Sequence, residues 1–249
     1  MNSVGIPGAD WLQGHADVVW ATSKLMPAVT GNTIDSSGWN QHPQGARIVE
    51  VTSQLDGPVN TLKKRLTTLI DAQMPELASL IAHDQAVSVS YSDRYLKSPW
   101  SQMLLSGFWE LLRSDQLQSL AVQTLAPSGS QPSYLLSHDW ICVDDQAAIL
   151  ELWLKSQFDI APSITVMHSP RDLLHCRVIT VNWASGKISK ILLDQGMGYW
   201  RGRTPYRDQM NFDFNAQHHD QAMQMIEKYS YAQMQQSGEW PTYISCVVT

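Results

Sequence analysis

The sequence has few cysteines and no long apolar run, and both shortages limit what the protein can be. Its three cysteines, Cys142, Cys176 and Cys246, are an odd number at wide spacings, which fits neither a disulfide framework nor a Cys-x-x-Cys metal knuckle. No stretch approaches the roughly 20 apolar residues of a membrane span, and the N-terminus lacks the pattern of a signal peptide. We therefore expect reduced thiols, a cytoplasmic location and no membrane span.

Positive charge is also scarce. The 17 Lys and Arg residues are outnumbered by 23 Asp and Glu residues, which gives a formal net charge of −6. Non-specific binding of nucleic acid depends on clustered basic groups that displace counterions from the phosphates. This charge balance argues against a broadly basic surface, so any phosphate site must be local.

The 249 residues, 43% of them hydrophobic, are enough for one substantial core or two small ones. The ten tryptophans leave two alternatives open. Some of them could anchor a contact with another chain, or all of them could be ordinary core and surface residues.

The chain divides into an N-terminal arm and one folded domain. Residues 1–43 are rich in Gly, Ser, Asn and Pro and show no helical or strand period, which predicts an irregular arm. The arm carries Trp11, Trp20 and Trp39 and could pack on a partner or on the domain itself. Residues 44–249 form the domain.

Within the domain, strand and helix patterns alternate. Strands are predicted over about 46–51, 86–91, 118–125, 163–168, 175–183, 187–193 and 242–248. Helices are predicted over about 60–81 with a cap at Asn60 and a break or kink at Pro75, from Ser98-Pro99 through Leu112, and over about 145–158 and 216–235. This order predicts an α/β fold with a mixed sheet flanked by helices.

The strongest candidate for chemistry is His175-Cys176-Arg177. His175 and Arg177 are two residues apart on a predicted strand, so their side chains leave the same face and can converge on one small anion. A histidine there could attack phosphorus while the guanidinium holds the non-bridging oxygens. The same spacing also fits an ordinary hydrogen-bonded pair.

This segment resembles the phospholipase D superfamily motif, in which His-x-Lys is followed after four residues by Asp. Here it stands as His175-x-Arg177 and Asn182, with Arg for Lys and Asn for Asp. The order of later motifs is similar to the phospholipase-D-like C-terminal domain of eukaryotic MIT-domain proteins over about residues 85–235. The matching segments are Ser92-Asp93-Arg94-Tyr95, His175-Cys176-Arg177, Gly186, Ile191-Leu192-Leu193, Gly196-Met197-Gly198-Tyr199-Trp200 and Phe212-Asp213-Phe214.

The resemblance implies a phosphate site with reduced or no catalysis. In active members the histidine is the nucleophile or general acid, the lysine binds phosphate, the aspartate supports the pair, and two motifs meet in one site. A chain with one motif therefore implies a homodimer or a subunit of a larger complex. Arg177 preserves anion binding as a planar fork, whereas the neutral amide of Asn182 can orient an imidazole but cannot stabilise an imidazolium. The resemblance assigns the catalytic positions to His175, Arg177 and Asn182.

Further phosphate-binding candidates follow from position and charge. Asp93 and Arg94 lie in the predicted βα loop at the carboxyl end of a strand, where open α/β sheets bind ligands, although they could equally form a surface ion pair. Arg201, Arg203 and Arg207 make one local basic cluster that could bind a phosphodiester or an inositol phosphate, or could be a solvated loop.

Two acidic or histidine-rich segments are weaker candidates for a metal. His138-Asp139 with Asp144-Asp145 could bind a hard cation, but acids also favour the N-terminus of a helix. His218 and His219 are adjacent on a predicted helix and point in different directions, which makes a poor chelate. We predict neither a metal nor a cofactor.

Together these patterns predict a catalytically degenerate, phospholipase-D-like module that binds phosphate on nucleic acid. Nucleic acid is preferred to lipid because the sequence shows no amphipathic basic helix or lipidation signal. The junction Asp93-Arg94-Tyr95-x-x-Ser98-Pro99 also resembles regions appended to prokaryotic helicase-like proteins of DNA-processing or defence systems. Two alternatives stay open. One is an active, metal-independent nuclease or phosphodiesterase that uses His175, and the other is a scaffold in which His175 and Arg177 are buried and paired internally.

Overall fold

The computed structural model describes residues 46–127, 143–173, 177–203, 219–236 and 241–249. Residues 47–249 cluster as one unit. The irregular arm predicted at 1–43, with Trp11, Trp20 and Trp39, lies outside the described residues.

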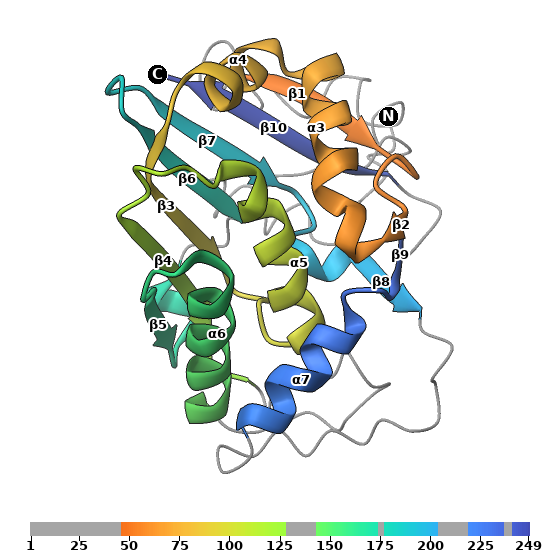
Figure 1. The fold of residues 1–249 in the computed structure, drawn as a ribbon, viewed down its shortest axis with the longest axis vertical. Coiled ribbons are helices and arrows are strands. Elements are labelled where there is room, and N and C mark those ends of the chain that lie inside the picture. The colour runs from red at the N-terminus through yellow and green to blue at the C-terminus, as the bar shows by residue number, and fades with distance from the viewer. Residues whose placement is uncertain (1–45, 128–142, 174–176, 204–218, 237–240) are drawn as a thin grey trace, which may run out of the picture. The chain divides into compact units, whose positions relative to one another are not determined.

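A seven-stranded sheet organises the described part of the domain (Figure 1), with the strand order β1-β10-β7-β6-β3-β4-β5. β3, β4 and β5 run parallel to one another, and the remaining neighbours pair antiparallel. The predicted mixed sheet is therefore confirmed. The strands are β1 (Arg47–Val51), β3 (Ala86–Asp93), β4 (Ser119–Leu125), β5 (Ser163–Met167), β6 (Val178–Trp183), β7 (Ile188–Leu193) and β10 (Thr242–Val248).

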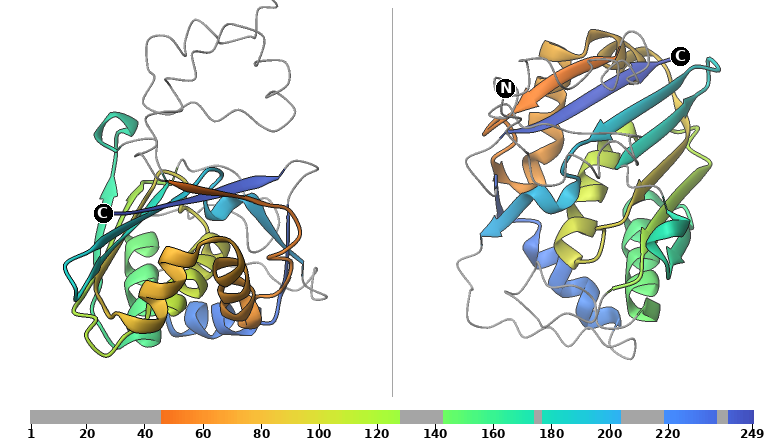
Figure 2. Two further views of the ribbon diagram at one scale, coloured as in Figure 1. Left: turned by 90° about the horizontal axis from the view of Figure 1, so that it is seen from above. Right: turned by 180° about the vertical axis from the view of Figure 1, so that it is seen from behind.

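The α-helices in the described part of the chain lie on one face of this sheet, as the view along its edge shows (Figure 2, left). They are α3 (Leu62–Gln73), α4 (Pro75–His83), α5 (Pro99–Trp109), α6 (Val143–Phe158) and α7 (His219–Tyr229). α5 is the central helix, and every residue in it except Gly107 is buried. No described helix is long and apolar enough to cross a membrane.

The alternation of side chains along the strands explains why the helices cover this face. In β6, Ile179, Val181 and Trp183 are buried on the helix side, whereas Asn182 is exposed on the other face. In the neighbouring β3, Val89 pairs with Val181 and is buried with it. Because successive strand residues point to opposite faces, the two faces of the sheet have different surroundings and different chemistry.

Three of the predicted helix boundaries depend on a proline or a capping residue. The break at Pro75 is confirmed, since α3 ends at Gln73 and α4 begins at Pro75. The cap at Ser98 is also confirmed, because its hydroxyl accepts from the backbone N–H of Ser101 in a capping box. The cap at Asn60 is wrong. Asn60 lies in a short 3-10 turn and α3 begins at Leu62, because the chain turns there to pair with residues that follow α7.

A second, three-stranded sheet corrects the end of the last predicted helix. That helix was expected to run to about residue 235, but α7 ends at Tyr229. The glutamine-rich segment β9 (Gln233–Gln236) instead pairs with β2 (Gly57–Pro58) on one side and β8 (Trp200–Arg203) on the other. Met234 is 1% exposed in this pairing. Burial against partners distant in sequence thus overrides a local helical pattern.

Trp100 joins this small sheet to the central helix. Its indole is 2% exposed, and its Nε1–H donates to the carbonyl oxygen of Trp200 at 2.7 Å. A Cβ at Gly202 would lie 3.0 Å from the Trp100 ring, so β8 passes over the indole at very close range. The small sheet therefore depends on both a glycine and an indole hydrogen bond.

We predict that Trp100→Phe lowers the free energy of unfolding more than Trp109→Phe does. Both indoles are buried, so both changes leave a similar void, but the described residues offer the Nε1 of Trp109 no acceptor. Trp100→Phe alone would leave a buried carbonyl without its donor, a difference of about 1–3 kcal/mol. Urea denaturation of the two variants measures it. Equal losses would show that the hydrogen bond to Trp200 is unimportant.

Candidate functional site

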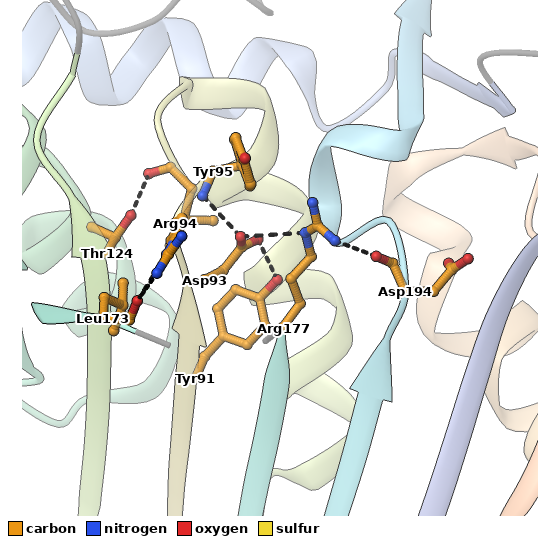
Figure 3. A network of polar contacts seen from close by, with 9 residues as sticks. Tyr91, Asp93, Arg94, Tyr95, Thr124, Leu173, Arg177 and Asp194 are labelled. Carbon is orange, nitrogen blue, oxygen red and sulfur yellow. Dashed lines mark hydrogen bonds and ion pairs between the residues drawn. The ribbon is translucent and has the colours of Figure 1, made fainter. Parts of the chain in front are cut away.

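Three chemistry-bearing residues meet at one end of the main sheet (Figure 3). Asp93 is the last residue of β3, Arg177 comes just before β6, and Asp194 comes just after β7. The register places them together, because Ser92 pairs with Val178 and Val178 pairs with Leu192. The site thus lies at the C-terminal ends of β3 and β7, the edge where open α/β sheets hold their ligands.

Asp93 is the most deeply buried member of the site. It has no exposed surface, and its carboxylate accepts from the Tyr91 hydroxyl at 2.7 Å and from the Tyr95 backbone N–H at 2.8 Å. Burial raises the pKa of Asp93, although both hydrogen bonds and the nearby Arg177 charge act in the opposite direction. Burial therefore outweighs the three interactions that favour the charged form of this carboxyl group.

Arg177 spans the gap between the two acidic residues. Its Nε lies 3.6 Å from Asp93 Oδ1, an ion-pair distance too long for a hydrogen bond. Its Nη1 donates to the main-chain oxygen of Asp194, and its guanidinium lies over the ring of Tyr95, 4.9 Å from the centroid. The side chain keeps 19% of its surface exposed. The other terminal nitrogen, Nη2, has no hydrogen-bond acceptor among the described residues.

Asp194 ties the site to the next strand. Its carboxylate accepts from the Thr242 hydroxyl and from the Tyr243 backbone N–H, the latter at 2.9 Å. It is 7% exposed, and burial raises its pKa while these hydrogen bonds lower it. Because the carboxylate holds β10, the main-chain oxygen of Asp194 is fixed where Arg177 reaches it.

The structure explains why the first position of the Gly-x-Gly motif, Gly196, is a glycine. Its φ is +64°, in the region that favours glycine, and a Cβ there would lie 2.4 Å from Arg177 Cδ and 2.7 Å from Asp93 Oδ2. Gly198, the second glycine, would place a Cβ in open space. The motif therefore lets the backbone after β7 close over the Arg177–Asp93 pair, and only its first glycine serves this purpose.

The other two residues of the predicted phospholipase-D-like motif are Asn182 and His175. Asn182 is five residues beyond Arg177 and on the opposite face of the sheet, roughly 16 Å along the strand, where its amide donates to Ser88 Oγ at 2.6 Å. The structure therefore does not bring Asn182 to Arg177. His175 lies outside the described residues, so its proposed role stays a prediction.

Arg94 points away from the site and clamps a loop. Its Nε donates to the Leu173 carbonyl at 2.8 Å, and its Nη2 donates to the carbonyls of Pro170 and Leu173. This arginine fixes the segment that leads towards residue 175. Its guanidinium is occupied by main-chain oxygens, and the structure does not bring it to the Arg177–Asp93 pair.

The other sequence candidates are only partly described. Arg201 and Arg203 both lie in β8, where Arg201 is exposed; the Arg203 side chain and the whole of Arg207 lie outside the described residues. Asp144 and Asp145 begin α6, while His138, Asp139 and His218 lie outside the description. No group of three or more metal-ligating side chains occurs within the described ranges. Tyr91, Tyr95 and Asp194 were not among the site residues predicted from the sequence, although Asp194 directly follows β7 and Tyr95 comes two residues after β3.

Comparison with known proteins gives one family match. Residues 45–248 match the family model described as the DEAD/DEAH box helicase YjiV, C-terminal domain. The matched range includes the main sheet, its helices and the whole Arg177–Asp93 site. No curated protein matches the chain.

We predict that Gly196→Ala and Gly198→Ala differ sharply. The first must place a side chain at φ +64° and ψ −166°, a region essentially confined to glycine, at a cost of about 1–3 kcal/mol, and also displace Arg177 or Asp93. The second meets no atom within 4 Å and should leave the unfolding midpoint close to wild type. Thermal unfolding of both variants tests this. A tolerated Gly196→Ala would contradict the close approach.

We also predict a distinctive pH dependence of stability. A carboxyl whose pKa is higher in the folded state stabilises the fold most fully below its ordinary pKa of about 4, and that contribution is lost as pH rises through the folded-state pKa. The raised pKa of Asp93 should therefore make stability fall as pH rises above about 4. Asp93→Asn should reduce this fall, as urea midpoints between pH 4 and pH 8 would show.

The control for this prediction is Asp84→Asn. Asp84 is partly exposed, and its hydrogen bond with Ser185 lowers its pKa, so its contribution to stability changes only below the ordinary value. Its loss should leave the slope between pH 4 and pH 8 unchanged. The prediction is wrong if wild type and Asp93→Asn show the same slope.

Proposed function

Because the chain belongs to the family of the DEAD/DEAH box helicase YjiV C-terminal domain, we propose that it is a phosphate-binding module of a nucleic-acid-processing, helicase-type assembly. The observation that carries the proposal is the placement of Arg177. Its guanidinium is held at the C-terminal edge of the sheet by Asp93, Asp194 and Tyr95, with Nη2 left available among the described residues.

A guanidinium fixed in this way is suited to bind an anion. Most of its side chain is already ordered, so little rotamer freedom is lost when a phosphate oxygen accepts from Nη2. A charge-assisted hydrogen bond of this kind is roughly twice as strong as a neutral one. The nearby Asp93 would oppose a phosphate while ionised, but burial raises the pKa of its carboxyl group and so favours the neutral form, which does not.

We infer binding rather than cleavage. Asn182, the residue in the position of the superfamily aspartate, lies on the far face of the sheet and bonds to Ser88. Two of the three guanidinium nitrogens of Arg177 already face protein oxygens. The resemblance to catalytically degenerate phospholipase-D-like domains agrees with this inference, and His175 belongs to the proposed site as a further phosphate ligand.

A second candidate function is that of a scaffold without its own ligand. The observation that favours it is the internal engagement of both arginines, since Arg94 binds main-chain carbonyls and most of the Arg177 side chain is buried. In that case the Arg177–Asp93 pair would only lock β3 to β6. Binding measurements separate the two candidates.

We predict that Arg177→Gln weakens the binding of a fluorescein-labelled oligonucleotide. Loss of one charge-assisted contact should cost about tenfold or more in affinity and reduce the dependence of log K on log salt concentration by about one unit. The matched control is Arg113→Gln. Arg113 loses the same charge, but its side chain is 52% exposed and pairs with Glu110 at the opposite end of the sheet. Fluorescence anisotropy over a salt series measures both variants.

Further comparisons define the outcome. Arg177→Lys keeps the positive charge but loses the planar guanidinium. Its affinity for the oligonucleotide should lie between those of wild type and Arg177→Gln. Circular dichroism checks that each variant is folded. Identical salt dependence in Arg177→Gln and Arg113→Gln would contradict the proposal and favour the scaffold. Cleavage of the oligonucleotide in EDTA, lost in His175→Ala, would instead establish a nuclease.

A further inference from the structure

Tyr95 places an exposed aromatic ring directly beside the candidate phosphate ligand. It follows β3 in the loop that leads to α5, and its side chain is 49% exposed, in a region where its neighbours Asp93 and Leu96 have no exposed surface. One face of the ring meets the Arg177 guanidinium at 4.9 Å. Figure 3 shows the ring beyond the ends of the strands, above the Asp93–Arg177 pair.

Two contacts with described residues help to hold the ring in place. The backbone N–H of Tyr95 donates to Asp93 Oδ1 at 2.8 Å, which fixes the start of the side chain to the buried carboxylate. The cation–π contact with Arg177 then orients the ring. A large apolar ring half exposed to water and fixed at its base is arranged to stack on a flat ligand at little entropic cost.

A guanidinium and an aromatic ring in contact match the two ends of one nucleotide, its phosphate and its base. We propose that Tyr95 stacks on an unpaired base while Arg177 holds the adjacent phosphate, so that the site binds single-stranded rather than duplex nucleic acid. This inference rests on the proposed phosphate-binding function. Bases in a duplex are stacked on each other and cannot stack on the ring, whereas single-strand sites combine cationic and aromatic groups.

A site that binds by stacking should not recognise the base sequence. Every base has a flat π face, so a single stacking ring gives little preference for one base over another. The site should therefore distinguish strandedness and the presence of a base, and not the sequence.

The experiment compares Tyr95→Leu and Tyr95→Phe in the full chain. Both keep the backbone N–H that binds Asp93, but only Phe keeps the ring. The probes are fluorescein-labelled oligothymidylate, the same length of abasic oligonucleotide, and the corresponding duplex. We expect Tyr95→Leu to bind oligothymidylate on the order of tenfold more weakly, with an unchanged salt slope, and Tyr95→Phe to bind like wild type. Binding of the abasic strand and of the duplex should be the same in all three proteins.

The outcomes separate this inference from the function on which it rests. If Arg177→Gln lowers the salt slope while Tyr95→Leu binds oligothymidylate like wild type, the phosphate site stands and the stacking inference is overturned. If Tyr95→Leu weakens the abasic strand as much as oligothymidylate, the ring only positions Arg177, and stacking is again overturned. If neither Arg177→Gln nor Tyr95→Leu changes binding, both proposals fail.

Discussion

The buried carboxylate of Asp93 is the constraint on which this end of the molecule depends. A carboxylate without exposed surface is costly unless it is paired and hydrogen-bonded, and Asp93 obtains its partners from three directions. Tyr91 lies on its own strand, Tyr95 lies in the loop to α5, and Arg177 comes just before the neighbouring strand β6. Removing one partner of such a pair typically costs about 3–5 kcal/mol. The contact thus fixes β3, β6 and the βα loop relative to one another.

Two glycines after β7 let the backbone pass close to buried side chains, and these close contacts connect the Asp93 site to the rest of the domain. Gly196 lets the segment after β7 pass over the Arg177–Asp93 pair, and Gly202 lets β8 pass over the indole of Trp100. Both glycines follow β7 within nine residues, so one stretch of chain joins the strand-end site to the small sheet and to the central helix. Asp194 lies in the same stretch and binds the start of β10. The site is therefore a junction of the fold as well as a candidate ligand site.

The one-sided covering of the sheet decides which residues can act together. The Arg177 side chain lies on the helix side with Asp93, whereas Asn182 is exposed on the other face with Ser88. A motif that is contiguous in sequence is divided between two environments, because five residues along a strand reverse the direction of the side chain. This division is the reason we propose a module that holds phosphate rather than one that cleaves it. The family match to a helicase C-terminal domain is compatible with a module of a DNA-processing assembly.

Local sequence patterns were enough to predict the mixed α/β fold, the βα unit with its Ser98 cap, the break at Pro75 and the hairpin between β6 and β7. These features depend on local period, capping and turn chemistry, which neighbouring residues carry. It also indicated Asp93 and Arg177 as candidates. Only the tertiary structure decided that Asp93 is the carboxylate beside Arg177, that Arg94 is occupied by the Pro170 and Leu173 carbonyls, and that residues 233–236 form a strand. Those outcomes depend on pairings between segments up to about 180 residues apart, and no local pattern specifies which distant strand will be the neighbour.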